Sequence, residues 1–429
     1  MENRVKTLIQ FIDHSPSCFH VIENAKKQFL EHGFIQLEEK EHWNLEEGKS
    51  YFVERNGSSM IAFHLPKKDF QGFHIVASHS DSPTYRIKEQ PEMSVEKHYT
   101  KLNIERYGGM IPETWFDRPL SVAGRIIIEE NGQIKDQLVN VDRDLMIIPN
   151  LAIHMSRSSN ESKQLNPQKD LLPLCGGNLT KDGFEEMIAK ESGVEKEDIL
   201  SYDLFLYNRM RGTTLGINEE FVAAPKLDDL ECAYSSIEGM LNAKLSKDYV
   251  TVCAVFDNEE VGSGTKQGAG STFFPEVLKR ISYLCGKNEE EYYMAVADSF
   301  MLSADNAHAV HPNYQDKTDP TNRPYINEGI VLKYNASQKY TTDANSAALV
   351  KYLCKKEKIK CQVFFNRSDM LGGSTLGNIL TGQVSIKAAD IGLPQLSMHS
   401  TYETAGCKDL DDMITLLGSF YELGKEVQI

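Results

Sequence analysis

Apolar and polar positions in the first third of the chain change from a helical period to a strand-like one. Over residues 3–32 apolar side chains recur every three or four positions, and a Ser-Pro-Ser break divides them, which predicts two helices. From Tyr51 onward, short runs rich in β-branched and aromatic residues predict strands: YFVERNG, SMIAFHL and GFHIVASHSD. Two later segments predict β-hairpins, NIERYGG and residues 115–142, with Asn131-Gly132 as a tight turn.

Beyond Lys226 the pattern alternates between helices and strands. Helices are predicted for LECAYSSIEGML, FPEVLKRISYLC and ANSAALVKYLCKK, and strands for YVTVCAVF, YYMAVADS, KCQVFF and DIGLPQLSMHS. This alternation is typical of an α/β fold with a mixed central sheet flanked by helices. We expect one main α/β domain made of residues 1–91 and 226–429, interrupted by a β-rich insertion at 92–225. The polar stretch 156–182 is expected to run over the surface.

Length and charge narrow the class of protein. The chain has 429 residues, more than one growing hydrophobic core usually contains, so an insertion of domain size is reasonable. A formal net charge of −16 argues against partners that are themselves anionic, nucleic acid and acidic membrane surfaces. The eight cysteines include no CxxC pair, and no apolar segment reaches roughly 18 residues, the length of a membrane span. We therefore expect reduced thiols and a cytoplasmic protein.

Several predicted strands end in residue types that bind metal ions. In an α/β sheet the carboxyl ends of the strands lie at one edge, where their loops meet. His79 and Asp81 are one residue apart, so in extended backbone both point to the same face, where a carboxylate can orient a metal-bound imidazole. The other segments that end in candidate ligands carry Asp228, Asp229, Glu259, Glu260, Asp305 and His399.

Each feature has an ordinary explanation when taken alone. Carboxylates after a strand are usually solvated, Asp is a common helix N-cap, and a single histidine is most often half-buried and hydrogen-bonded. Two histidines together with several carboxylates and no thiolate match Zn²⁺, Mn²⁺ or Co²⁺. Two such ions, about 3.5–4 Å apart, need a bridging carboxylate. In the adjacent pair Glu259-Glu260, one carboxylate could hold an ion while the other accepts a proton from water.

Motifs spread over nearly the whole chain resemble those of the aspartyl aminopeptidases, metallopeptidase family 18. They occur in the same order: SPSCFHVIENAKKQFLEHGF, SHSDSP, TWFDRPLSVAGR, LAIHMSR, KLDDL, FDNEEVGS, SADNAHAVHPNY, NRSDMLGGSTLG and LSMHS. The resemblance implies a two-metal aminopeptidase fold, two zinc ions with cobalt or manganese as alternatives, and a tetrahedral homo-dodecamer. It also implies peptides as substrates, from which N-terminal amino acids are released.

The resemblance assigns a metal-binding role to five residues. His79 and His399 would be terminal ligands of different ions, and Asp228 would bridge the two. Glu260 and Asp305 would complete the ligand set. The family usually has Asn after the bridging aspartate, where this chain has a second Asp, so the sequence leaves open which of the two aspartates bridges.

The remaining assignments concern catalysis and the substrate. Glu259 would be the general base, and Asp81 the partner that orients His79. Substrate-binding residues would be His308, Lys333 and Tyr340, together with His154, which in the family projects into the site of a neighbouring subunit. Judged from the sequence alone, His154 reads as a structural residue of an apolar strand and Lys333 as a surface lysine.

Two departures from the family pattern affect the substrate pocket and not the predicted metal ligands. Leu371-Gly372 stands where relatives commonly have Pro-Cys, and Thr401-Tyr402 where they commonly have Ile-Arg. The sequence therefore predicts an aminopeptidase but leaves open whether it prefers acidic N-terminal residues. A related two-metal deacylase or carboxypeptidase is the nearest alternative. A further alternative is a non-catalytic metal-binding assembly protein. The presence of Glu259 argues against this alternative.

Overall fold

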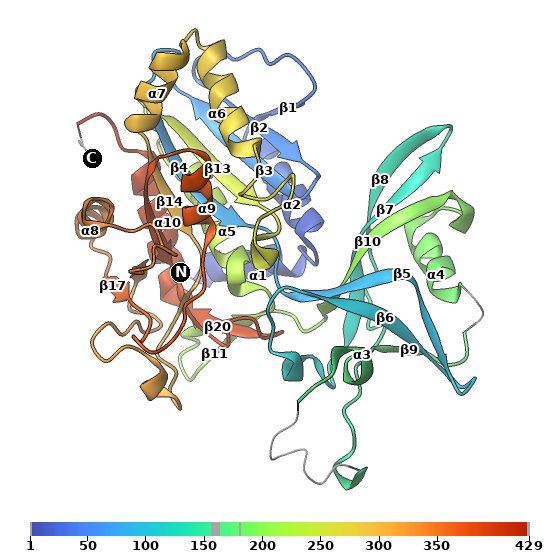
Figure 1. Ribbon diagram of the computed structural model, residues 1–429. Helices are drawn as coiled ribbons and strands as arrows, with labels where there is room; N and C mark the ends of the chain where they lie inside the picture. The colour runs from blue at the N-terminus through green and yellow to red at the C-terminus, as the bar shows by residue number, and fades with distance from the viewer. Residues whose placement is uncertain (1, 156–163, 180–181, 427–429) are drawn as a thin grey trace.

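The computed structural model describes residues 2–155, 164–179 and 182–426, and Figure 1 shows them as two units, each built on a sheet. The larger unit contains a nine-stranded sheet in the order β1-β2-β3-β13-β4-β14-β18-β16-β17. The central strands β13, β4, β14 and β18 run parallel, whereas β3 and β16 are antiparallel to their central neighbours. The predicted mixed sheet is therefore confirmed. Its strands are β1 (Ile35–Leu37), β2 (Lys49–Arg55), β3 (Ser59–Leu65), β4 (Phe73–His79), β13 (Val250–Phe256), β14 (Phe300–Ala304), β16 (Ile330–Lys333), β17 (Cys361–Phe364) and β18 (Lys387–Gly392).

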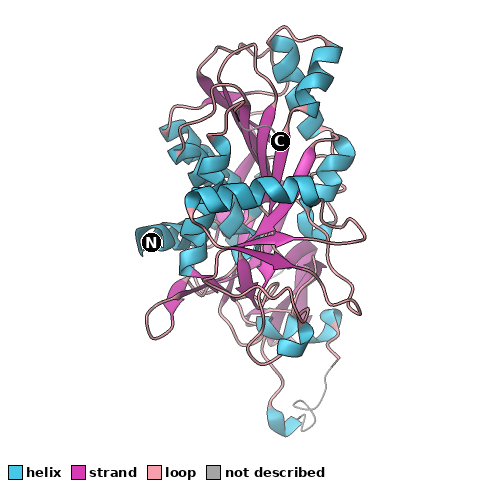
Figure 2. Ribbon diagram, turned by 90° about the vertical axis from the view of Figure 1, so that its left-hand side faces the viewer, coloured by secondary structure: helices cyan, strands magenta, loops and turns pink. Residues whose placement is uncertain are grey.

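Helices cover both faces of this sheet, as Figures 1 and 2 show. The strands bury side chains on both faces: on β4, Val76 belongs to one apolar core, while Ile75 and Ala77 belong to the other. The predicted flanking helices are thus confirmed. The first core is covered by α1 (Glu2–Asp13), α2 (Cys18–Glu31), α5 (Leu227–Asn242), α8 (Ala344–Glu357) and α10 (Cys407–Tyr421), and the second by α6 (Phe273–Leu284), α7 (Glu289–Ala297) and α9 (Leu376–Gln383).

The smaller unit contains a six-stranded sheet in the order β8-β7-β10-β5-β6-β9 with an apolar core of its own. The β7–β8 hairpin turns at Asn131 and Gly132, whose φ angles of 55° and 77° are those of a type I′ turn, as predicted. Its elements are β5 (Thr84–Val95), β6 (Tyr99–Tyr107), β7 (Leu120–Glu130), β8 (Gln133–Asn140), α3 (Pro167–Asp170), β9 (Leu174–Gly176), α4 (Gly183–Ser192) and β10 (Ile199–Asn208).

A five-stranded sheet in the order β11-β12-β20-β19-β15 connects distant parts of the sequence. Its strands are β11 (Thr213–Leu215), β12 (Phe221–Ala224), β15 (Ala307–His308), β19 (Pro394–Leu396) and β20 (Glu403–Gly406). The end of the predicted insertion thus pairs with the C-terminal part of the chain, and β5 already begins at Thr84. The domain boundaries at 92 and 225 stay a prediction.

One predicted strand is a helix. Most of the segment YYMAVADS lies in α7, and the strand follows it as β14. A reciprocal capping box between Asn288 and Glu291 starts the helix, and its buried residues recur at helical spacing. The β-branched and aromatic composition of the segment favoured a strand, but the local cap and the helical period override that propensity. The buried residues are Tyr292, Ala295 and Val296.

All eight cysteines are free, which confirms the prediction of reduced thiols. Within residues 2–155, 164–179 and 182–426, none of the helices combines the length and apolar character needed to traverse a bilayer. The greater part of the predicted polar excursion at 156–182 falls on residues 156–163 and 180–181, which lie outside the described residues, and on α3 and β9.

Candidate metal centre

The carboxyl ends of β4, β13 and β14 bring several predicted ligands to one edge of the sheet. β4 and β13 are parallel neighbours with His79 opposite Phe256, so the loop that carries Glu259 and Glu260 begins beside His79. On the other side of β4, β14 leads directly into Asp305. Asp228 joins them from the first turn of α5, and His399 from the loop after β19.

Asp228 lies between the two predicted histidine ligands. Its Oδ1 is 3.4 Å from Nε2 of His79, and its Oδ2 is 3.3 Å from Nε2 of His399. The same His399 nitrogen is 3.4 Å from Oε2 of Glu260. Groups of candidate ligand atoms within 4.8 Å of one another are His79 with Asp228, Asp229 and Asp305; His79 with Glu259 and Glu260; and Asp228 with Glu260 and His399.

Asp229 is engaged differently from Asp228. Its Oδ2 accepts a hydrogen bond from the backbone N–H of His79 at 3.0 Å and lies 3.9 Å from Nε2 of the same residue. It makes no contact with His399 comparable to that of Asp228. Of the two aspartates, Asp228 is therefore the one whose two carboxylate oxygens face both predicted histidine ligands.

Asp81 links His79 to the pair Glu259-Glu260. Oδ1 of Asp81 lies 3.3 Å from Nδ1 of His79, and the backbone oxygen of Asp81 lies 3.1 Å from the same ring nitrogen. The Asp81 carboxylate also accepts hydrogen bonds from the backbone N–H groups of Glu259 and Glu260 and from the hydroxyl of Tyr107 at 2.6 Å. A single buried carboxylate thus fixes the imidazole orientation and the position of both glutamates.

Glu403 is a site residue that sequence reasoning missed. Its side chain is buried, with Oε2 accepting from the backbone N–H of Asp228 at 2.9 Å and Oε1 from that of His399 at 2.7 Å. It therefore holds together the two segments that carry these ligands. The only signal in the sequence was a glutamate four residues after His399.

The cluster fits divalent cations on the chemistry of its donors. Among the described residues, Oδ1 of Asp228, Oδ1 of Asp229 and Oε1 of Glu260 are buried and accept no hydrogen bond. Leaving ionised carboxylates buried without a partner costs free energy, which a bound cation offsets. Carboxylate oxygens and imidazole nitrogens without a thiolate form a donor set that suits zinc.

The electrostatics of the cluster favour the same conclusion. Burial, together with the nearby charge of Asp305, raises the pKa of Glu259 to about 8. Burial also raises the pKa of Asp305 to about 6, against the opposing effect of Lys333. Crowded carboxylates repel one another, and cations among them stabilise the ionised forms. The site is therefore built to attract positive charge.

The predicted substrate residues lie in different environments. Lys333 is buried, not a surface lysine: its Nζ donates to the backbone oxygens of Asp305 and Asn306 at 2.8 and 3.1 Å. The ring centroid of Tyr340 lies 5.3 Å from this ammonium. His308 is exposed on β15, and His154 is exposed in the turn Ile153–Met155, not in an apolar strand. Lys333 and Tyr340 thus adjoin the cluster through Asp305. Among the described residues, His154 makes no hydrogen bond or ion pair with the cluster.

Comparison with known proteins identifies the family. The model of the family described as aminopeptidase I zinc metalloprotease (M18) matches residues 11–421. The chain belongs to the M18 family of zinc aminopeptidases. It is a hydrolase, a metallo-aminopeptidase. A probable M18 family aminopeptidase 2 of Clostridium acetobutylicum is 45% identical over 97% of this chain and 98% of its own length, and one of Pseudomonas aeruginosa is 37% identical over 96% and 97%.

Solved M18 structures share the fold over almost the entire chain. A chain in the cryo-EM structure of the Ape4 and Nbr1 complex has a TM-score of 0.95 at 36% identity, and covers 98% of this chain and 85% of that one. The mApe1 dodecamer of Saccharomyces cerevisiae has a TM-score of 0.85 at 26% identity, with 98% and 97% covered. The M18 enzyme of Thermotoga maritima, at 22% identity and a TM-score of 0.88, covers 98% and 96% and supports the fold alone.

Gly392 allows the close approach that positions Asp305 in this M18 chain. A Cβ atom at Gly392 would lie 2.0 Å from the backbone oxygen of Asp305, closer than van der Waals contact permits. We expect Gly392→Ala to displace Asp305 and to reduce both kcat/KM and zinc affinity by about tenfold or more, because ligand geometry tolerates little displacement. Zinc titration with a chromophoric chelator measures the affinity. Gly382→Ala, whose Cβ meets open space, is the matched control and should behave as wild type.

Proposed function

We propose that the chain is a dinuclear-metal aminopeptidase in which Glu259 is the general base. The observation that carries this proposal is the position of Asp228 between His79 and His399, with the Glu259-Glu260 pair held beside them. One ion would be held by His79, Asp228 and Asp305, and the other by Asp228, Glu260 and His399. Zinc is the expected metal at both positions, since the family is one of zinc metalloproteases.

Bound zinc ions would supply the Lewis acidity that polarises a peptide carbonyl and acidifies a water molecule. The protein contributes the proton transfers and the orientation of the groups. Glu259 accepts a proton from the attacking water through its carboxylate and delivers it to the nitrogen of the leaving amine. Asp81 holds the backbone of Glu259 by a hydrogen bond of 3.1 Å, which fixes the base relative to His79.

Lys333 supports a preference for acidic N-terminal residues. It is a buried cation beside the cluster: two of its three ammonium donors are used by the backbone oxygens of Asp305 and Asn306, and Oδ1 of Asp305 lies 3.7 Å from the same ammonium. At 3.7 Å this carboxylate is beyond hydrogen-bond distance, so the third donor can pair with a substrate carboxylate, where a charge-assisted hydrogen bond contributes about 1.5–3 kcal/mol. We therefore place the side chain of an acidic N-terminal residue near Lys333 and Tyr340, with His308 at the exposed margin of the pocket.

A panel of peptides that differ only in the N-terminal residue tests this function. Zinc-loaded protein should release amino acids one at a time from the N-terminus, fastest from aspartyl and glutamyl peptides. Release from the C-terminus, or cleavage only of N-acyl amino acids, would instead identify a carboxypeptidase or a deacylase. Absence of release from every peptide would contradict the enzymatic proposal and favour a non-catalytic assembly protein.

Lys333→Met should change the ranking within that panel. Loss of the ammonium removes the partner of an acidic side chain, so kcat/KM for a glutamyl peptide is expected to fall about 10–100-fold relative to a leucyl peptide. The steady-state ratio of the two substrates measures the effect. Lys360→Met, at the exposed position just before β17, should leave the ratio unchanged. An equal fall for both substrates would show that Lys333 supports the cluster without selecting the substrate.

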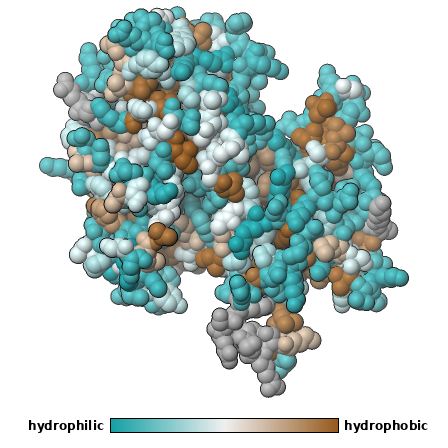
Figure 3. Space-filling model, viewed as in Figure 1, coloured by the Kyte–Doolittle hydropathy of each residue, from teal (hydrophilic) through white to brown (hydrophobic). Residues whose placement is uncertain are grey.

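Assembly into a homo-oligomer is the other part of the proposal. The mApe1 structure of Saccharomyces cerevisiae is that of a dodecamer, and we propose for this chain a dodecamer as well, with tetrahedral symmetry. In support, His154 lies among exposed apolar residues, and Figure 3 shows apolar surface at this lower end of the smaller unit. Covering these residues with a second copy would remove apolar area from water and bring His154 to a neighbouring site. Free thiols throughout are consistent with a cytoplasmic location. The exposed apolar residues are Leu151 (48%), Ile153 (47%) and Met155 (77%).

A further inference from the structure

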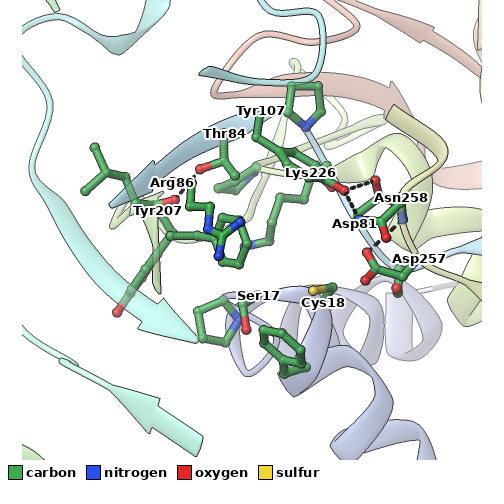
Figure 4. A pocket seen from close by; sticks show the side chains of 18 of the residues that line it. Ser17, Cys18, Asp81, Thr84, Arg86, Tyr107, Tyr207, Lys226, Asp257 and Asn258 are labelled. Carbon is green, nitrogen blue, oxygen red and sulfur yellow. Dashed lines mark hydrogen bonds between the residues drawn. The ribbon is translucent and has the colours of Figure 1, made fainter. Parts of the chain in front are cut away.

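We propose that a second cavity, next to the metal cluster, binds a small organic carboxylate at Lys226. The cavity has a volume of about 260 Å³ and lies between the two units, bounded by the start of α2, the strands β5, β6 and β10, and the loops after β12 and β13 (Figure 4). Asp228, a member of the cluster, and Asp81, which contacts His79, line its wall on the side of the cluster. Neither Glu259 nor Lys333 nor Tyr340 lines it, so it is distinct from the proposed substrate pocket.

Lys226 is the charged group in this cavity that has no partner. Figure 4 shows its side chain extending into the pocket. Within the described part of the chain no hydrogen bond or ion pair is found for its ammonium, and the charges that act on it are those of Asp13 and Glu403. Both carboxylates already accept hydrogen bonds, Asp13 from Gly212 and Glu403 from the segments of the metal cluster. An ammonium without a counter-ion in a partly buried cavity favours a bound anion.

The beginning of α2 adds positive potential to the same wall. Pro16, Ser17, Cys18 and Phe19 line the cavity, and the N-cap residue Ser17 makes no side-chain hydrogen bond to the first turn. Its hydroxyl is instead paired with the ring of His20 at 2.8 Å. The free N–H groups and the dipole of the helix therefore favour negative charge at this end. Two independent features, an unpartnered ammonium and an uncapped helix start, thus select an anion.

Five carboxylates line the cavity, and the contacts of three of them, Asp81, Asp257 and Asp203, lie with groups other than the lysine. Asp81 accepts from Tyr107 and from two backbone N–H groups. Asp257 accepts from the backbone of Asn258 at 2.7 Å and from the side chain of Gln267. Asp203 pairs with two arginines, at 2.7 Å with Arg86 and at 3.0 Å with Arg125. Glu403 accepts from two backbone N–H groups, and Asp228 faces His79 and His399, so among the described residues none of these carboxylates has a hydrogen bond or ion pair with Lys226.

Aromatic walls define the rest of the ligand. Phe19, Phe205 and the ring of Tyr107 line the cavity, and the rings of Tyr107 and Phe205 pack edge to face with centroids 5.7 Å apart. A carboxylate with a short apolar chain would place its charge at Lys226 and its chain against these rings. A free amino acid, the product of the proposed peptidase reaction, and a simple fatty acid share this chemistry.

The cavity adjoins the machinery of the cluster through Tyr107. Its hydroxyl donates to Asp81 at 2.6 Å and accepts from the side chain of Asn258 at 2.8 Å, while its ring faces the cavity. Asp81 in turn holds Glu259 and His79. A ligand that packs against Tyr107 would therefore affect catalysis without occupying the substrate pocket. Its effect on the rate of peptide hydrolysis, whether inhibition or activation, should be non-competitive with the peptide.

Calorimetric titration of the zinc-loaded protein tests the site. The probes are isocaproate, L-leucine and isoamylamine, which share an isobutyl group and differ in their charged groups. We expect both carboxylates to bind and the amine not to bind. Lys226→Met should weaken the affinity for isocaproate by at least about tenfold. Lys226→Arg and the surface variant Lys247→Met should bind isocaproate with the affinity of the wild type. Tighter binding of leucine than of isocaproate would identify the amino acid as the preferred source of the carboxylate.

Binding is measured independently of peptidase activity, so failure here is distinguishable from failure of the proposed function. Unchanged affinity in Lys226→Met would place the carboxylate elsewhere, for example at the zinc ions, and would overturn the proposal. Equal binding of isoamylamine, or no binding at millimolar concentration, would also overturn it. Should Lys226→Met not fold, crystals of the wild type soaked with para-bromobenzoate decide the matter. The bromine anomalous peak is expected between Lys226 and Phe205, and its absence from the cavity would contradict the site.

Discussion

Replacement of Glu259 by Gln is expected to lower kcat for peptide hydrolysis about 10²–10⁴-fold while both zinc ions remain bound, because a positioned general base contributes a factor of this size. The amide keeps the shape of the side chain but cannot accept the proton from water. Because the backbone N–H of Glu259, not its carboxylate, is the group bound by Asp81, the substitution leaves that hydrogen bond intact. The expected signature is loss of turnover with little change in substrate binding.

Steady-state kinetics and metal analysis on the same preparation measure the two quantities together. Glu186→Gln, on the exposed face of α4, is the matched control and should retain full activity. Residual activity within a factor of three of wild type would remove Glu259 from the role of base. A parallel loss of zinc would instead make it a metal ligand, exchanging its role with that of Glu260.

Asp228→Asn is expected to have the second large effect, the loss of both metal ions. The aspartate contacts His79 with one oxygen and His399 with the other, so it is the carboxylate common to both ligand groups. Substitutions of residues that only orient metal ligands typically reduce metal affinity 10–100-fold, and removal of a shared ligand should exceed about 100-fold. Peptidase activity should fall with the metal content.

Zinc content after dialysis, together with the fold as judged by circular dichroism, measures this effect. Asp69→Asn, at an exposed position outside the cluster, should retain both ions. Retention of one ion by Asp228→Asn would show that the carboxylate serves a single ion, and retention of two would transfer the bridging role to Asp229. A protein that loses its fold with the metal would show that zinc binding and folding are coupled.

The sequence predicted much of the cluster because three of its segments follow from one geometrical rule. Parallel neighbouring strands expose the residues after their carboxyl ends at the same edge, so His79, the pair Glu259-Glu260 and Asp305 could be expected to meet. Residue chemistry then limited the cluster to oxygen and nitrogen ligands. The roles of single residues needed the geometry, since Asp228 and Asp229 are chemically identical and differ only in where their oxygens point.

Other features of the structure could not be predicted from the sequence. Glu403 lies on β20 and Tyr107 on β6, and only the tertiary arrangement shows that their side chains converge on Asp228, His399 and Asp81. In α7 a local capping box outweighed a composition that favours strands. Lys333 looked like a surface residue because nothing in its neighbourhood reveals the two backbone oxygens that accept its hydrogen bonds.

The central claim is that two metal ions share Asp228, and a crystal structure with anomalous data at the zinc absorption edge tests it most directly. The account predicts two peaks in the cluster, one beside His79 and Asp305 and one beside His399 and Glu260, both next to Asp228 and about 3.5–4 Å apart. A single peak in zinc-saturated crystals, or two peaks of which only one adjoins Asp228, would contradict it.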